Sequence, residues 1–166
     1  MTKEELGDLI VLNKEGFYRI AKTILTDDAD CADAISAAIV KAFAHFGDLK
    51  KDKYAKTWFV RILINECYAV SRQLIRVVKV DPLDMPDYMQ HEREDYSDLY
   101  EAIHKLPEGI GIVITLYYVE GYRIKEIAEM LDLTQSAVKN RMLRGRKRLK
   151  ELLEGREGVQ YESEGV

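Results

Sequence analysis

The chain has 166 residues, 47% of them hydrophobic, and a net charge of −4, so it can bury the core of one domain or of two small ones. Its three prolines and ten glycines, among many alanines, leucines and lysines, favour helices over sheet. The first residues lack the basic and then apolar pattern of an export signal, and the longest apolar run, 109–119, reaches about half of the roughly 20 residues of a membrane span. We therefore expect an all-α cytoplasmic protein without membrane insertion.

The residue types that carry metal or catalytic chemistry are sparse and scattered. Cys31 and Cys67 match no CxxC spacing, and the three histidines form no ligand-like group, so neither a structural metal nor a disulfide is expected. The sequence also shows no pairing of a nucleophile with a base and no acidic cluster with metal-ligand spacing. It therefore predicts no catalytic residue, no cofactor and no enzyme activity.

Hydrophobic periodicity predicts three helices in the first part of the chain. Residues 4–25 carry apolar side chains at spacings of three and four, as in a helix with one buried face. Capping residues at 26–30 precede a second helix that ends at Gly47. A third periodic segment follows a charged loop and runs from about Tyr54 to Arg76. These segments predict a three-helix domain over residues 1–76.

A break in periodicity separates this domain from a second one. Residues 77–98 hold two of the three prolines and an excess of acidic residues, which predicts a flexible acidic linker. Four helical segments follow and predict a second domain over 99–153. Residues 154–166 are rich in Gly and Glu without periodicity, and a disordered tail is expected there.

The last two helical segments have the layout of a helix-turn-helix. Residues 122–131 and 135–153 are joined by a turn of about three residues. Thr134 is placed to cap the second of these helices. Asp132 would have to adopt the left-handed backbone conformation, which Asp tolerates better than most residues. The second helix is therefore the candidate recognition helix.

Projected at about 100° per residue, the segment 135–153 separates an apolar line from a cationic surface. Val138, Met142, Leu149 and Leu152 fall on the apolar line. The opposite side suits a major groove, where planar donors read base edges and flanking cations contact the phosphates. A solvated face with paired charges is the alternative, but the sequence has no acid between Asp132 and Glu151. The predicted DNA contacts are Ser136, Lys139, Asn140, Arg141, Leu143, Arg144, Arg146, Lys147 and Arg148.

The predicted helix 54–76 offers a second polar surface, opposite its apolar side. Cations alternate there with a planar amide and an aromatic ring, a combination that suits single-stranded bases and their phosphates. An ordinary amphipathic helix is equally compatible with the pattern. The residues of this surface are Arg61, Asn65, Tyr68, Arg72 and Arg76.

Three stretches together resemble one protein family. They are DCADAISAAIVKAF at 30–43, YAKTWFVRILINECYAVSR at 54–72, and LPEGIGIVITLYYVEGYRIKEIAEMLDLTQSAVKNRMLRGRKRLKELL at 106–153. In order and spacing they resemble bacterial RNA polymerase sigma factors of the extracytoplasmic-function type. The resemblance implies a three-helix region 2, which melts and reads the promoter −10 element, and a four-helix region 4, which reads the −35 element.

The resemblance also implies roles for individual residues. It places −35 contacts at Lys139, Asn140, Arg141, Arg144 and Arg146. It places Asn65 at a position that handles the non-template −10 strand, and it makes the loop 47–57, with Lys50, Lys51 and Lys53, the loop that captures a flipped base. Where the family commonly shows Asp-x-x-Gln-Glu for the polymerase clamp, this chain has Asp33 followed by Ser36 and Ala37. Asp33 and Lys41 are the expected polymerase contacts.

The expected function is therefore that of a sigma factor. It would bind core RNA polymerase and promoter DNA, and the resemblance implies an anti-sigma factor as a further partner. Because the chain is acidic overall, useful DNA affinity should require the polymerase. The alternative is a stand-alone helix-turn-helix regulator with an amino-terminal dimerisation or sensor domain, which would footprint a symmetric operator without polymerase.

Overall fold

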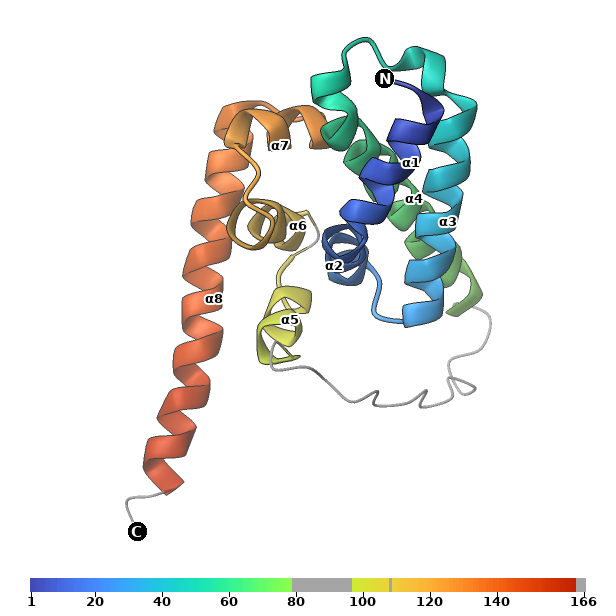
Figure 1. The fold of residues 1–166 in the computed structure, drawn as a ribbon. Helices are drawn as coiled ribbons and strands as arrows, with labels where there is room; N and C mark the ends of the chain where they lie inside the picture. Colours follow the sequence, from blue (N-terminus) through green and yellow to red (C-terminus); the bar gives the residue numbers. More distant parts are fainter. Residues whose placement is uncertain (79–96, 108, 164–166) are drawn as a thin grey trace. The chain divides into compact units, whose positions relative to one another are not determined.

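The computed structural model confirms the all-α prediction. It describes residues 1–78, 97–107 and 109–163, and every regular element in these ranges is helical (Figure 1). The chain divides into two compact units, Met1–Met89 and Gln90–Val166. Apart from residues 77, 78, 97 and 98, the predicted linker lies outside the described residues. Within the described ranges, no helix is both long enough and apolar enough to cross a membrane.

The first unit contains one helix more than the sequence predicts. The predicted helix over 4–25 is divided at Asn13, which has φ −105° and ψ 12° and whose side-chain amide donates to the Leu9 carbonyl at 2.8 Å. Asparagine competes in this way for backbone partners, so one helix ends and the next begins without a loop. The helices are α1 (Lys3–Leu12), α2 (Lys14–Ile24), α3 (Asp28–Ala44) and α4 (Ala55–Val78), with 3₁₀ turns at Phe46–Asp48 and Asp52–Tyr54.

The core of the first unit joins α2, α3 and α4. Phe17 of α2 and Phe59 of α4 pack with their ring centroids 4.7 Å apart, and both are fully buried. Small side chains let α3 approach α4 closely. The buried residues of α3 are Cys31, Ala34, Ala38 and Ala42.

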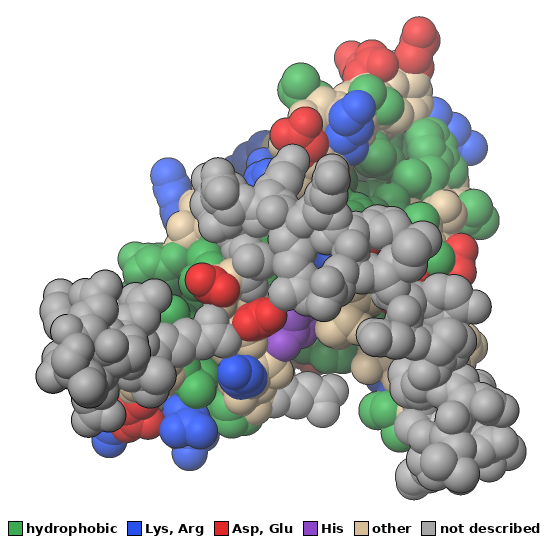
Figure 2. Space-filling model, turned by 90° about the horizontal axis from the view of Figure 1, so that it is seen from below, with side chains coloured by type: hydrophobic (Ala, Val, Ile, Leu, Met, Phe, Trp, Pro, Cys, Tyr) green, Lys and Arg blue, Asp and Glu red, His purple; other side chains and the backbone are tan. Residues whose placement is uncertain are grey.

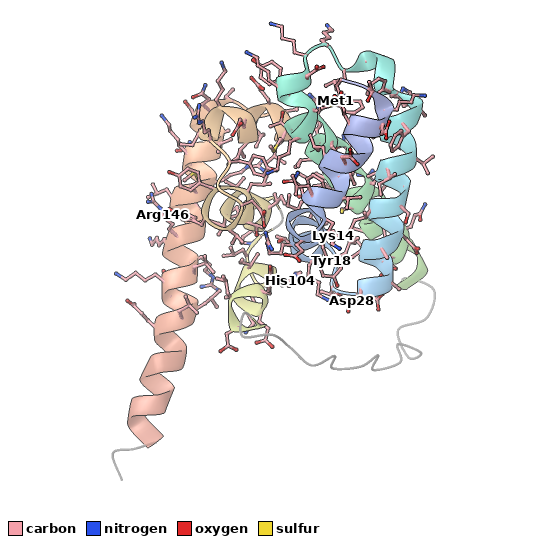
Figure 3. All side chains as sticks on the ribbon, viewed as in Figure 1. Met1, Lys14, Tyr18, Asp28, His104 and Arg146 are labelled. Atoms are coloured by element: carbon pink, nitrogen blue, oxygen red, sulfur yellow. The ribbon has the colours of Figure 1, made fainter. Side chains whose placement is uncertain are left out.

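Polar groups hold the junction between α2 and α3. The Tyr18 hydroxyl donates to the Asp28 carboxylate, and the Lys22 ammonium lies 2.6 Å from the same carboxylate (Figure 3). Burial and the hydrogen bond to Asp28 raise the pKa of the Tyr18 phenol, so it remains a donor at neutral pH. Asp27 caps α3 by accepting from the Asp30 amide at 3.1 Å. These contacts tie the end of α2 to the start of α3 across the turn 25–27.

The two thiols of this core should be unreactive in the native protein. Cys31 and Cys67 are free and fully buried, and burial raises the pKa of Cys31 to about 11 and that of Cys67 to about 12. Because the thiolate is the reactive species, a disulfide reagent should modify neither thiol at neutral pH and both in urea. Absorbance of the released thiolate measures this. Fast modification in native buffer would show that the α3–α4 core opens readily.

The second unit is built around the packing of α6 on α8. Leu106, Ile110 and Ile114 form its hydrophobic core with Leu149 and Leu152. A Cβ at Gly145 would lie 2.7 Å from the Ile114 Cδ1 atom and 2.9 Å from the Ile110 Cγ2 atom, so the two helices approach too closely for a side chain there. The elements are α5 (Ser97–His104), α6 (Ile110–Ile114), the π-helix η3 (Thr115–Val119), α7 (Ile124–Leu131) and α8 (Gln135–Ser163).

The helix α8 is longer than expected, because it includes residues 154–163 of the predicted tail. No proline interrupts this stretch, and ion pairs support successive turns. The Arg148 guanidinium lies 3.2 Å from the Glu151 carboxylate, and the Lys150 ammonium lies 3.7 Å from that of Glu154. Glu154, the first residue of the predicted tail, thus pairs with a cation of the preceding turn.

Candidate nucleic-acid interface

The turn between α7 and α8 has the predicted helix-turn-helix chemistry. Asp132 ends α7 in the left-handed conformation, with φ 56° and ψ 47°, and the Leu133 amide donates back to the Ala128 carbonyl at 2.9 Å. The Thr134 hydroxyl accepts from the Ala137 amide at 3.1 Å and so caps α8. Both predictions about this turn are confirmed. Its local bonds fix where α8 begins.

The apolar line predicted on α8 is also confirmed. Val138 and Met142 are buried, and Leu149 and Leu152 pack partly buried against the core. On the opposite side, Leu143 is 60% exposed. The outward residues, all exposed, are Ser136, Asn140, Leu143, Arg144 and Lys147.

Several cations lie on this outward side of α8 and on its flanks. Within the described ranges, Lys139, Arg144, Arg146 and Lys147 are exposed and form no ion pair. Arg146 lies on α8 with its side chain directed away from α6 (Figure 3). On the face drawn in Figure 2, acidic side chains lie among the cationic ones. The unpaired cations of α8 are suited to phosphates.

Two predicted contacts on α8 do have protein partners. Arg148 pairs with Glu151, as described above. Arg141 is half-buried, and its Nη1 donates to the Gly109 carbonyl at 3.3 Å. Arg141 therefore differs from Arg144 and Arg146, which are exposed, in being half-buried and hydrogen-bonded to the protein.

The second predicted surface lies along α4. Arg61, Asn65 and Arg72 are exposed, Tyr68 is half-buried, and the side chain of Arg76 lies outside those that the structure describes. The polar side of α4 therefore presents an amide between two guanidinium groups.

The loop before α4 carries exposed lysines and one exposed ring. Lys50, Lys51 and Lys53 are all exposed, and the Lys53 ammonium lies 4.9 Å from the ring centroid of Tyr54. Sequence reasoning did not single out Tyr54, although an aromatic residue within a lysine-rich loop is a signal for base stacking. Tyr54 is 46% exposed and so presents much of its ring to solvent.

The two expected polymerase contacts on α3 differ in their surroundings. Asp33 is exposed. The Lys41 ammonium pairs with the carboxylate of Glu66 on α4, whose side chain is only 12% exposed. Lys41 therefore compensates a nearly buried charge, a structural role that the sequence did not suggest.

Replacing Lys41 with methionine should destabilise the first unit. We expect its free energy of unfolding to fall by about 1–2 kcal/mol, because the Glu66 carboxylate loses its partner while the exposed lysine limits the effect. Trp58, the only tryptophan, lies on α4, so its fluorescence in urea reports this unit. Glu66→Gln in the Lys41→Met background should restore part of the loss. An unchanged unfolding curve for Lys41→Met would contradict the structural role.

Comparison with known proteins matches both units of the chain to one family. A family model described as sigma-70 region 2 matches residues 9–76, and one described as sigma-70, region 4 matches residues 96–149. The RNA polymerase sigma factor SigV of Bacillus subtilis is 28% identical over 149 residues, covering 88% of this chain and 89% of SigV. The ECF RNA polymerase sigma factor SigW of the same organism is 23% identical over 168 residues, covering 91% of this chain and 90% of SigW.

Solved structures share the fold. The sigma factor RpoE of Bartonella quintana, in complex with the anti-sigma factor NepR, matches with a TM-score of 0.78 and 22% identity, covering 91% of this chain and 98% of RpoE. CnrH, in complex with the cytosolic domain of CnrY, matches with a TM-score of 0.71 and 22% identity, covering 93% of this chain and 90% of CnrH.

The two matched regions and the helix-turn-helix define a bacterial transcription initiation factor. The chain belongs to the sigma-70 family, in its extracytoplasmic-function group, and is a sigma factor that directs promoter recognition by RNA polymerase. The family resemblance seen in the sequence is thereby confirmed.

Proposed function

We propose that α8 reads the promoter −35 element. The observation that carries this proposal is the outward side of α8, which presents Asn140 and Arg144 between cations that have no ion pair within the described residues. Asn140 and Arg144 would read base edges, and Lys139, Arg146 and Lys147 would contact the two phosphate backbones. Ser136 and Leu143 complete the surface, with the Leu143 side chain available to a thymine methyl.

We further propose that the first unit binds the −10 element as a single strand. Asn65 would contact the non-template strand, with the cations of α4 along its phosphates and the loop 47–57 around a flipped base. Domain boundaries follow from this division: region 2 over 1–76, the linker over 77–98 and region 4 over 99–153. The protein itself would carry out no catalytic step, since the polymerase supplies the chemistry.

Core polymerase and an anti-sigma factor are the proposed protein partners. Asp33 is the proposed polymerase contact on α3, since it is exposed and matches the first position of the clamp motif. An anti-sigma partner is supported by RpoE, which shares the fold and was solved with NepR. A polymerase would bring the acidic protein and the promoter together at high effective concentration.

Copurification with core polymerase, followed by transcription from promoters that the holoenzyme selects from a random pool, tests the proposal. We expect a stable complex with core and transcripts that start downstream of selected −35 and −10 elements. Free promoter binding should be weak and should fall steeply with salt. Absence of a complex with core, together with tight promoter binding by the protein alone, would overturn the proposal in favour of a stand-alone regulator.

A further inference from the structure

Arg141 joins the recognition helix to the segment that leads into α6. Its Nη1 donates to the Gly109 carbonyl at 3.3 Å, across 32 residues of sequence, and Gly109 directly precedes α6. One turn further along α8, Gly145 packs against Ile110 and Ile114. Two successive turns of α8 therefore contact α6 or the residue before it, one through a charged hydrogen bond to Gly109 and one through close apolar packing on Ile110 and Ile114.

Position 109 is fitted to this contact in two ways. Gly109 has φ +83°, a conformation that side chains disfavour. A Cβ there would also lie 2.7 Å from the Arg141 Nη1 atom and 3.5 Å from its Cζ atom. The absence of a side chain at 109 thus lets the guanidinium reach the carbonyl. If Arg141 served only to contact DNA, its side chain would not need a glycine at position 109.

The contact lies where it can orient the residues that face DNA. Val138 and Met142 are buried on the earlier turns of α8, and Leu149 and Leu152 pack its later turns onto the core. Asn140 and Arg144 are on earlier turns, beside Arg141. The hydrogen bond from the Arg141 guanidinium to the Gly109 carbonyl adds a directional restraint on these turns, beyond their apolar packing. Base reading depends on such alignment, because bidentate contacts are directional.

We infer that Arg141 is a positioning residue for −35 recognition: it acts through Gly109 to set how α8 presents Asn140 and Arg144, and it does not contact DNA itself. The inference rests on the proposed role of α8 at the −35 element. It separates Arg141 from the other cations of the helix that were predicted to contact DNA.

The test compares variants of the full chain assembled with core polymerase. The holoenzyme first selects a −35 element from a random pool, and occupancy is then measured on every single-base-pair variant of that element and as a function of salt. The variants are Arg141→Met, Gly109→Ala and their combination. Gly121→Ala is the matched control, since Gly121 also has a positive φ, +74°, but no atom within 4 Å of a Cβ. Arg144→Met serves as the reference for a direct contact.

Arg141→Met and Gly109→Ala should each lower discrimination across the whole −35 element by about tenfold, the size expected from the loss of one charge-assisted hydrogen bond. The combination should be no worse than either change alone, because both break the same contact. Gly121→Ala should retain discrimination. Arg144→Met combined with Gly109→Ala should lose less than the product of the two separate losses, because the contact acts partly through Arg144.

Three results would overturn the inference. Loss of discrimination at a single base pair in Arg141→Met would show a base contact. A salt slope reduced by about one, with discrimination intact, would show a phosphate contact. Multiplication of the Arg141→Met and Gly109→Ala losses would show that the residues act separately.

A folding check and the Arg144→Met reference complete the experiment. Circular dichroism checks that each variant is folded, and if Arg141→Met is not, Arg141→Lys replaces it. The lysine keeps a donor for the Gly109 carbonyl, so it should retain most of the discrimination, and a loss at one base pair only would again overturn the inference. If Arg144→Met changes neither discrimination nor the salt slope, the proposed role of α8 fails, and the inference with it. Failure of the Arg141 arm alone overturns only the inference.

Discussion

Replacing Arg144 with alanine is expected to cost about 1–3 kcal/mol of discrimination at one base pair of the −35 element. Arg144 is exposed at the centre of the outward side of α8, and within the described residues its guanidinium has no ion pair to hold it elsewhere. A planar guanidinium in this place can donate two parallel hydrogen bonds to a guanine edge, and alanine can donate none. Occupancy of the holoenzyme on single-base-pair variants of a selected −35 element measures the effect.

Arg144→Lys is the matched control, because it keeps the charge and removes the planar pair of donors. If Arg144 reads a base, lysine should recover overall affinity but only part of the discrimination. If Arg144 instead contacts phosphate, alanine should weaken binding equally on all sequences and lower the salt slope by about one, and lysine should restore both. That second pattern would contradict a base-reading role.

The helix-turn-helix could be predicted from sequence because its determinants are local. Asp132 and Thr134 act on backbone groups within a few residues, and the position of each side chain on α8 follows from helical periodicity. The same argument placed Val138 and Met142 in the core and Asn140 and Arg144 outside it, as the structure shows. Local chemistry thus determined both the turn and the division of α8 into two sides.

The partners of individual cations could not be predicted, because they depend on tertiary contacts. Arg141 donates to Gly109 on a segment 32 residues away, and Lys41 pairs with Glu66 on another helix. A helical projection shows which way a side chain points but not which helix packs beside it. Both residues were predicted to face a binding partner, whereas the structure gives each of them a contact within its own unit.

The division at Asn13 was missed for a different reason. Apolar spacings of three and four continue through residues 4–25, so periodicity alone favours one helix. At the break the side-chain amide of Asn13 donates to the Leu9 carbonyl, a bond that apolar spacing cannot reveal. Asparagine is disfavoured inside helices because it makes such bonds, and this was the signal available in the sequence.

Replacing Asn65 with alanine should impair promoter opening more than promoter recruitment. Asn65 is exposed on α4, in line with Arg61 and Arg72, where an amide can hydrogen-bond a base only after the strands separate. We expect the open complex on a duplex promoter to fall by about tenfold, which corresponds to the loss of one or two hydrogen bonds. Permanganate reactivity of unpaired thymines measures opening, and retention of labelled promoter at low temperature measures recruitment.

A promoter mismatched over the −10 element separates opening from the later steps. On this template the strands are already apart, so an amide that helps to hold the opened strand contributes less to the overall rate, and Asn65→Ala should recover most of its transcription. Gln73→Ala is the control, since Gln73 is another exposed amide on α4 outside the line of Arg61, Asn65 and Arg72. It should resemble the unchanged protein on both templates. If the mismatch does not rescue Asn65→Ala, the residue acts outside melting, and the surface along α4 belongs to polymerase docking or to the stability of the first unit.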